Sequence, residues 1–281
     1  MGFTLPVQEQ DGLKMIGVGA SGQVYEIDEN IVLKSGRVYK PPNDDTTPLD
    51  RWHYVSESIF HFELISNERK ICQLLEQNPH PNLAEPISTV HAEGIYLRRY
   101  NSRPELSQAG RSQRISLYRD VLRGLDHLHG LGIAHSDLRM ENVLFDVHGQ
   151  AIVCDFSASA MFGQPNLAQP TLDCPVPLNG LDETVSDATD RFALESLMFH
   201  LETGVKPDLS IGNAGTVLLP QVEMKHPDIG VIIKKAWLGK FASTTEMLQN
   251  VESIKKQTDM STPQHTPTKD TLQYLATQWR A

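Results

Sequence analysis

The sequence predicts an α+β protein in which a small β-rich lobe is followed by a larger helical lobe. Short β-like runs, separated by turn residues, fill most of the first hundred positions, with one helical segment among them. Farther along the chain, apolar residues recur at helical spacing instead. With 281 residues, of which 40% are hydrophobic, the chain can bury a large core without disulfides or metal.

Three strands and one helix are predicted in the first hundred residues. The β-like runs cover residues 15–18, 23–27 and 31–34. The proline-rich stretch 41–48 is predicted to be an exposed loop. From about residue 56 to 77 apolar side chains recur at helical spacing, and Pro79 marks the end of that helix.

Two further helices are predicted in the later part of the chain. The first has one apolar stripe and ends at Gly130 and Gly132. The stripe consists of Tyr118, Val121, Leu122, Leu125 and Leu128. The second runs from about 189 to 202 and is apolar on most faces, so we expect it to be buried. Gly204 follows it as the kind of residue that commonly ends a helix.

Charge and composition exclude several classes of function. The chain has 25 Lys and Arg against 35 Asp and Glu, a net charge of −10, which argues against nucleic-acid or anionic-membrane partners. No apolar run is long enough to span a bilayer, and no secretory signal is recognisable at the start. The three cysteines, Cys72, Cys154 and Cys174, are odd in number and far apart, so we expect a reduced, intracellular protein. The eleven histidines lack the spacing of a metal site.

A glycine-rich turn follows the first predicted strand. Gly17, Gly19 and Gly22 form a GxGxxG pattern, which alone could be an ordinary turn. Here a strand follows it rather than a helix, which favours a flap that folds over a nucleotide and argues against a dinucleotide-binding site. Glycines at these positions let backbone N–H groups approach phosphate oxygens without a Cβ atom in between.

A second motif contains an ordered set of oxygen-bearing side chains. Asp137 and Asn142 precede an apolar run, and Asp155 follows the strand-like stretch 151–154. Phosphoryl transfer needs a carboxylate to hold the attacking hydroxyl, two oxygen ligands for Mg²⁺, and a cation near the transferred group. Arg139 completes this inventory. Each residue alone could merely cap a turn, but the ordered set favours phosphoryl transfer.

With these motifs the sequence resembles the eukaryotic protein kinase family. The resemblance implies a two-lobed protein kinase-like fold that binds ATP between its lobes. Asp137 matches the catalytic Asp of the family, and Asn142 and Asp155 match its Mg²⁺ ligands. Lys34 matches the Lys on the third strand that holds the α- and β-phosphates. Arg139 stands where Ser/Thr kinases usually have Lys and keeps a positive charge near the γ-phosphate.

The family pairs this Lys with a Glu on the following helix. Glu68 is the predicted partner, because it shares a helix face with Leu64 and Leu75, where a carboxylate needs a buried cation. Glu63 is the alternative.

The resemblance also implies a set of residues that contact the nucleotide. They are Ile16, Gly17, Val18, Gly19, Ala20, Ser21, Gly22, Val24, Val32, Lys34 and Leu144. Asp190 is expected to brace the catalytic loop. His135 is expected to pack against Phe156 and not to act as a base.

The sequence departs from the family pattern at three places. Ser136 replaces the Arg that usually precedes the catalytic Asp and binds a phosphorylated activation loop, so we expect that activity does not need this phosphorylation. Ser157 replaces the Gly of the Asp-Phe-Gly element, which keeps the metal ligand. No Ala-Pro-Glu lies between Asp155 and Asp190, and the stretch 175–179 occupies that region, so docking of a peptide substrate is less well predicted than nucleotide chemistry.

The resemblance covers most of the chain. It implies a protein kinase-like domain over residues 13–256, with an N-lobe over about 13–100 and a C-lobe over about 101–256. Residues 257–281 are expected to form a flexible tail, because the polar, proline-broken stretch 261–268 cannot build a core.

The predicted function is that of an ATP-dependent, Mg²⁺-requiring protein kinase that phosphorylates Ser or Thr hydroxyls. Two alternatives remain open. One is a kinase-fold phosphotransferase that acts on a small molecule, since a small residue at position 136 is typical of such enzymes. The other is a pseudokinase that binds partners without transferring phosphate. The sequence does not indicate an oligomeric state.

Overall fold

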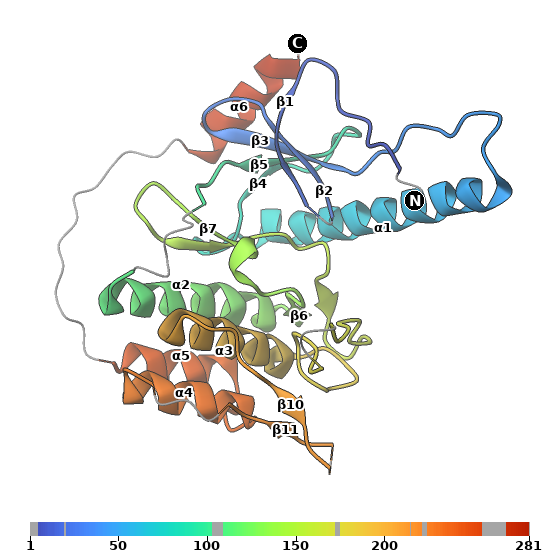
Figure 1. Cartoon of the computed structure of the whole chain (residues 1–281). Coiled ribbons are helices and arrows are strands. Elements are labelled where there is room, and N and C mark those ends of the chain that lie inside the picture. Colours follow the sequence, from blue (N-terminus) through green and yellow to red (C-terminus); the bar gives the residue numbers. More distant parts are fainter. Residues whose placement is uncertain are drawn as a thin grey trace.

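The computed structural model describes residues 5–19, 21–102, 109–171, 175–213, 215–220, 224–254 and 268–280. Figure 1 shows a β-sheet with one long helix at the top and a group of helices below it. This is the predicted α+β arrangement of a small β-rich lobe and a larger helical lobe. No helix within the described ranges is both long and apolar enough to cross a bilayer.

The N-lobe contains a five-stranded antiparallel sheet in the order β1-β2-β3-β5-β4. Its strands are β1 (Lys14–Val18), β2 (Gly22–Glu26), β3 (Ile31–Gly36), β4 (Pro86–Ser88) and β5 (Ile95–Arg98). The three strands predicted from the sequence are therefore confirmed. Lys34 lies on the central strand β3, opposite Val24 of β2 and Ile95 of β5.

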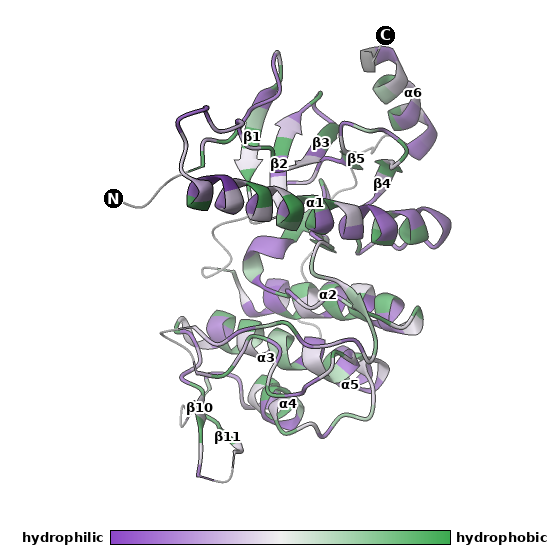
Figure 2. Cartoon of the chain, turned by 90° about the vertical axis from the view of Figure 1, so that its right-hand side faces the viewer, coloured by the Kyte–Doolittle hydropathy of each residue, from purple (hydrophilic) through white to green (hydrophobic). Residues whose placement is uncertain are grey.

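Helix α1 (Pro48–Gln77) crosses the N-lobe beneath the sheet and above α2 (Figure 2). It begins eight residues before the predicted start, so the loop prediction was wrong at Pro48 and the helix start at residue 56 was wrong as well. Thr47 caps the helix by accepting a hydrogen bond from the Asp50 N–H. Pro48 fits in the first turn, where its missing N–H has no helical partner.

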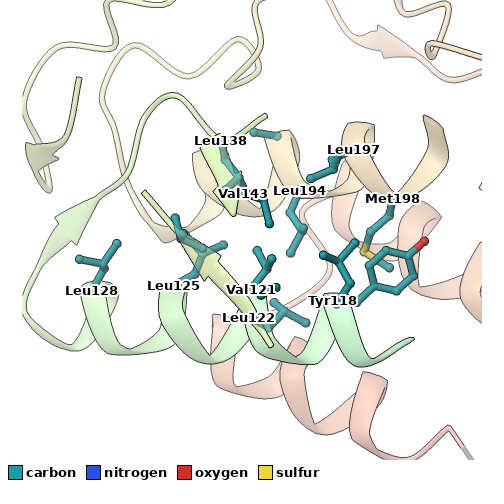
Figure 3. Close-up of a cluster of buried hydrophobic side chains, with 14 of the residues drawn as sticks. Tyr118, Val121, Leu122, Leu125, Leu128, Leu138, Val143, Leu194, Leu197 and Met198 are labelled. Atoms are coloured by element: carbon teal, nitrogen blue, oxygen red, sulfur yellow. The ribbon is translucent and has the colours of Figure 1, made fainter. Parts of the chain in front are cut away.

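The C-lobe is built mainly from helices α2 (Arg111–Gly130), α3 (Asp187–Thr203), α4 (Pro227–Trp237) and α5 (Thr244–Glu252), with a small hairpin of β10 (Ser210–Ile211) and β11 (Val217–Leu218). The predicted stripe of α2 is buried and packs against α3, as Figure 3 shows. Leu138, which follows Asp137, and Val143, which follows Asn142, join this core. Gly204 ends α3 with φ of 79°, as predicted.

Two short antiparallel strand pairs position the predicted catalytic residues. β6 (Ile133–Ala134) pairs with β9 (Ala160–Met161), and β7 (Val143–Phe145) pairs with β8 (Ala151–Val153). The catalytic-loop residues connect β6 to β7, and Asp155 lies just after β8. The β7–β8 hairpin therefore brings these two segments side by side, and the Cys154 N–H donates to the Asn142 carbonyl at 2.9 Å.

Helix α6 (Lys269–Arg280) corrects the expectation of a flexible tail over its own residues, whereas residues 257–267 of that expected tail lie outside the described ranges. It lies against the N-lobe sheet (Figure 1), far along the chain from the strands that it covers. Leu272 and Ala276 are buried in a second apolar cluster. Their partners there include Tyr25, Ile31, Leu33, Ile87 and Tyr96. The Gln273 side chain also donates to the Ile87 carbonyl at 3.1 Å. The sequence prediction failed because the composition of the proline-broken stretch 261–268 was extended to the amphipathic helix that follows it.

Candidate active site

Three charged side chains from three different elements meet between the lobes. Lys34 Nζ lies 2.7 Å from a carboxylate oxygen of Glu68 on α1 and 2.9 Å from Asp155 Oδ1. The Lys34 and Glu68 side chains are almost completely buried, whereas Asp155 keeps about a quarter of its side chain exposed. Glu63, the alternative partner, is exposed on α1. The structure therefore brings Lys34 together with Glu68 and not with Glu63.

The two carboxylates of this group stabilise the charge of Lys34. Burial alone would lower the pKa of Lys34, but the carboxylates of Glu68 and Asp155 outweigh it and raise that pKa. Burial works to raise the pKa of Asp155, yet the Lys34 ammonium and the hydroxyl donors of Ser157 and Ser21 bring it to about 2. At neutral pH the site therefore presents a charged ammonium beside an ionised carboxylate.

The backbone at Asp155 is held in an unusual conformation. Its φ of 65° lies in the left-handed region, which Asp adopts more readily than most residues because its short side chain can bond locally. The Ser157 hydroxyl donates to Asp155 Oδ1 at 2.7 Å. Asn67 on α1 fixes the following segment by donating to the carbonyls of Ser157 and Ser159 at 2.9 and 2.8 Å. The same helix thus holds both the Lys34 partner and the Asp155 segment.

The predicted catalytic-loop residues form a second group. Asn142 Nδ2 donates to the Asp137 backbone carbonyl at 2.8 Å and to its Oδ2 at 2.9 Å. Arg139 Nε lies 3.4 Å from the same Oδ2, on the exposed side. Burial raises the pKa of Asp137 above its ordinary value, although Arg139 and His135 oppose the shift. Asp137 is therefore a partly buried carboxylate held in one orientation.

The loop that carries Asp137 is fixed by α3. Asp190 is fully buried and accepts the N–H groups of His135 and Ser136 at 2.6 and 2.9 Å. The His129 ring lies 2.9 Å from the same carboxylate. These donors lower the pKa of Asp190 against the effect of its burial. His135 Nε2 lies 3.0 Å from the carbonyl of Cys154, so this ring is engaged in the structure of the loop.

The glycine-rich turn connects β1 and β2 and lies over the site. The Gly19 N–H donates to the Gly22 carbonyl at 2.8 Å, and a Cβ atom at Gly22 would lie only 2.1 Å from the Ser35 carbonyl oxygen. Only glycine fits there without moving β3. The Ser21 hydroxyl donates to Asp155 Oδ2 at 3.0 Å, which brings the turn down onto the predicted metal ligand. Gly17 lies on β1 opposite Val24.

The remaining predicted nucleotide contacts differ in exposure. Val32 is buried, Val24 and Leu144 are half-buried, and Ile16 and Val18 are exposed on β1. Ala20 lies outside the described residues. Among the described residues, no group of three or more His, Cys, Asp or Glu side chains could hold a metal ion by itself. A divalent cation at Asn142 and Asp155 would therefore take its other ligands from phosphate and water, as is usual for Mg²⁺.

Comparison with known proteins agrees with this geometry. A family model described as "Protein kinase domain" matches residues 11–175, which is more than half of the chain. The chain belongs to the protein kinase family. The resemblance seen in the sequence motifs is thus confirmed.

Curated relatives of this kinase include fungal and animal proteins. It is 26% identical to the serine/threonine-protein kinase STE20 of Yarrowia lipolytica, over 92% of the chain and 24% of that protein. It is 31% identical to the serine/threonine-protein kinase GIN4 of Saccharomyces cerevisiae, over 37% of the chain and 10% of that protein. It is 26% identical to NUAK family SNF1-like kinase 2 of Rattus norvegicus, over 69% of the chain and 31% of that protein. The kinase therefore spans less than a third of the length of each of these relatives.

Sequence reasoning missed two polar residues of this kinase that hold the site, and one contact of a third. Ser21 was predicted to contact nucleotide, but its bond to Asp155 was not foreseen. Asn67 and Asn179 were not singled out at all, although both donate to backbone carbonyls of the site segments. Asn67 could have been noticed as the neighbour of Glu68 on the buried side of α1. No sequence signal marks Asn179, because its partner is a main-chain atom.

Proposed function

We propose that this kinase transfers the γ-phosphate of ATP to a Ser or Thr hydroxyl of a protein, with Mg²⁺ as the cofactor. The observation that carries the proposal is the meeting of Lys34, Glu68 and Asp155. A buried Lys remains charged only where anionic groups compensate for the loss of water, and here two carboxylates do so. When one of these carboxylates binds a metal cation instead, the Lys ammonium becomes available to bind phosphate. The serine/threonine class is supported by the names of the relatives and by Arg139 in the catalytic loop.

Each residue has a defined role in the proposed transfer. Asp137 orients the attacking hydroxyl and accepts its proton, because its carboxylate is fixed by Asn142 and partly exposed. Lys34 holds the α- and β-phosphates, with Glu68 keeping its ammonium in place. Arg139 places positive charge beside Asp137, near the phosphate being transferred.

The donor set fits the Mg²⁺ ion that the family implies. Asp155 stays ionised, with a pKa of about 2, and offers carboxylate oxygens. Asn142 uses its Nδ2 on Asp137, so its amide oxygen is the atom that it can present to a cation. When bound, Mg²⁺ would neutralise charge on the phosphates and so favour transfer. These hard oxygen atoms suit Mg²⁺ better than a soft metal.

We further propose that the kinase acts without phosphorylation of its activation loop. Ser136 cannot form the ion pair that an Arg would make with a phosphorylated residue. The stretch 156–190 contains no Lys or Arg at all, so a phosphate added there would find no cation within its own segment. The backbone at Ser136 is instead held by neutral and acidic side chains already present.

We propose a catalytic domain over residues 13–256, divided near residue 100, to which one later helix is added. Helix α6 contributes to its N-lobe, since Leu272 and Ala276 complete an apolar cluster of the sheet.

The proposal is tested by one assay on the unphosphorylated full chain. Labelled Mg²⁺·ATP is supplied with generic protein substrates, with peptides containing Ser, Thr or Tyr, and with small hydroxyl compounds. We expect transfer to Ser or Thr in proteins, and loss of nearly all transfer in Asp137→Asn. That variant should keep the thermal stabilisation by Mg²⁺·ATP, which is about 2.7 kcal/mol at 100 times the dissociation constant.

Other outcomes of this assay distinguish the alternatives. Transfer only to small hydroxyl compounds would identify a small-molecule phosphotransferase. Stabilisation by Mg²⁺·ATP without any transfer would indicate a nucleotide-binding pseudokinase. Absence of both would refute the proposed nucleotide site itself.

A further inference from the structure

The residue before Asp137 has an unusual backbone conformation. Ser136 has φ of 66°, in the left-handed region that non-glycine residues rarely adopt. Such a conformation persists where surrounding groups fix it, and it is frequent at functional sites. Both backbone polar groups of Ser136 have side-chain partners: its N–H donates to Asp190 Oδ1 at 2.9 Å, and its carbonyl accepts from Asn179 Nδ2 at 2.6 Å.

Asn179 is built into the fold for this contact. The residue is 1% exposed, and its Oδ1 has no hydrogen-bond partner in the part of the chain that the structure describes. It therefore acts through the Nδ2 donor. The residue lies in a tight turn in which the Gly180 N–H donates to the Pro177 carbonyl at 3.0 Å. Gly180 has φ of 80°, and a Cβ atom there would lie 3.2 Å from the Phe192 ring, so the turn is packed closely on α3.

Helix α3 therefore holds Ser136 from both sides. Asp190 fixes the N–H directly, and the turn seated on Phe192 fixes the carbonyl through Asn179. The fixed carbonyl belongs to the peptide group between Ser136 and Asp137. Its orientation sets the direction in which the Asp137 side chain leaves the backbone.

We propose that Asn179 is a positioning residue for Asp137. By this inference the stretch 175–180, which stands where the family has Ala-Pro-Glu, holds the catalytic carboxylate in place by a neutral hydrogen bond. The inference rests on the role of Asp137 in the proposed function. The chain thus supplies, from its own folded segment, support that many kinases obtain from a phosphorylated residue.

The test uses Asn179→Asp in the full chain, because it keeps the shape of the side chain and replaces the donor by an acceptor. We expect kcat to fall about 10- to 100-fold, since a small misplacement of a catalytic group costs that much. The KM for Mg²⁺·ATP should stay within about twofold, because Asn179 does not contact Lys34 or Asp155. Asn179→Ala removes the same bond without burying a charge and applies if the first variant does not fold.

The matched control is Asn166→Asp. Asn166 Nδ2 also donates to a carbonyl, that of Asp182 at 3.0 Å, but this bond is exposed and its partner is not a catalytic-loop residue. This control should leave kcat and KM unchanged. An equal loss of kcat in both variants would mean that any disturbance of the 156–190 stretch has this effect, and would overturn the assignment.

A second measurement does not depend on activity. Hydrogen–deuterium exchange over residues 133–139 should rise about fivefold in Asn179→Ala, while exchange in α2 and α3 stays as in the unchanged protein. Unchanged exchange together with unchanged kcat would overturn the inference. A rise throughout the molecule, with Mg²⁺·ATP binding lost as well, would overturn it by showing a merely structural role. If the unchanged protein transfers no phosphate to any acceptor, the proposed function fails, and exchange alone decides whether Asn179 holds the loop.

Discussion

Helix α6 gives a sharp prediction about the extent of the folded unit. Leu272 is fully buried against the N-lobe sheet, whereas Tyr274, two residues on, is 64% exposed. Leu272→Ala leaves a cavity in that cluster, and core substitutions of this kind cost about 2–5 kcal/mol. Because the helix lies at the edge of the molecule, we expect the lower end, about 2–3 kcal/mol. Ala and Leu are both good helix formers, so helix propensity hardly changes.

Tyr274→Ala is the matched control, because it truncates an exposed side chain of the same helix. It should change the free energy of unfolding by less than about 0.5 kcal/mol. Thermal and urea unfolding followed by circular dichroism measure both variants, and Leu272→Ala should lower Tm by about 4–8 °C. A chain that ends at Ile254 should be less stable than Leu272→Ala, because it loses all of helix α6 from the N-lobe sheet. Equal stability of the two point variants would refute the assignment of α6 to the N-lobe.

Two further predictions concern the charged groups of the site. Glu68→Gln leaves Lys34 with only one carboxylate partner, so kcat/KM for Mg²⁺·ATP should fall at least about tenfold in steady-state assays. The control is Glu63→Gln, which changes an exposed residue of the same helix and should leave kcat/KM unchanged. Equal kcat/KM values in the two variants would contradict the pairing of Lys34 with Glu68. In the proposed mechanism Asp137 acts in its ionised form, so log kcat should fall as pH drops through the pKa of Asp137, which burial raises above its ordinary value. Arg139 lowers the pKa of Asp137, so in Arg139→Ala kcat should begin to fall at a higher pH. A pH–rate profile that stays in place or moves to lower pH would contradict this prediction.

Much of the fold follows from local sequence patterns. The β-like runs, the apolar stripe of α2 and the glycine after α3 were all predicted, because burial leaves a clear period in the sequence. The start of α1 was missed because proline was taken to exclude a helix, although it is favoured in the first turn at Pro48. Helix α6 was missed because a polar, proline-broken stretch dominated the composition around it.

Some residues of the candidate site could likewise be predicted from the sequence, and others could not. The resemblance implied that Lys34 pairs with a Glu on the following helix, and Glu68 could be chosen because a carboxylate on an apolar helix face needs a cation. The bonds of Asn67 and Asn179 were harder to predict, because each side chain donates to backbone carbonyls, which every residue has; Asn67 offered only its position beside Glu68 as a signal. Such bonds depend on where distant segments meet, and no residue pattern records that.

These amide bonds also determine how the site can move. Asn67 and Glu68 are neighbours on α1, and they hold the Asp155 segment and Lys34 respectively. A shift of α1 that withdraws Glu68 from Lys34 must therefore also break the bonds of Asn67 to the carbonyls of Ser157 and Ser159. Lys34 would then lose a partner at the same time as Asp155 loses the segment that fixes its left-handed backbone. Because the two changes have one cause, the proposed phosphate-binding and metal-binding parts of the site are expected to become ordered or disordered together.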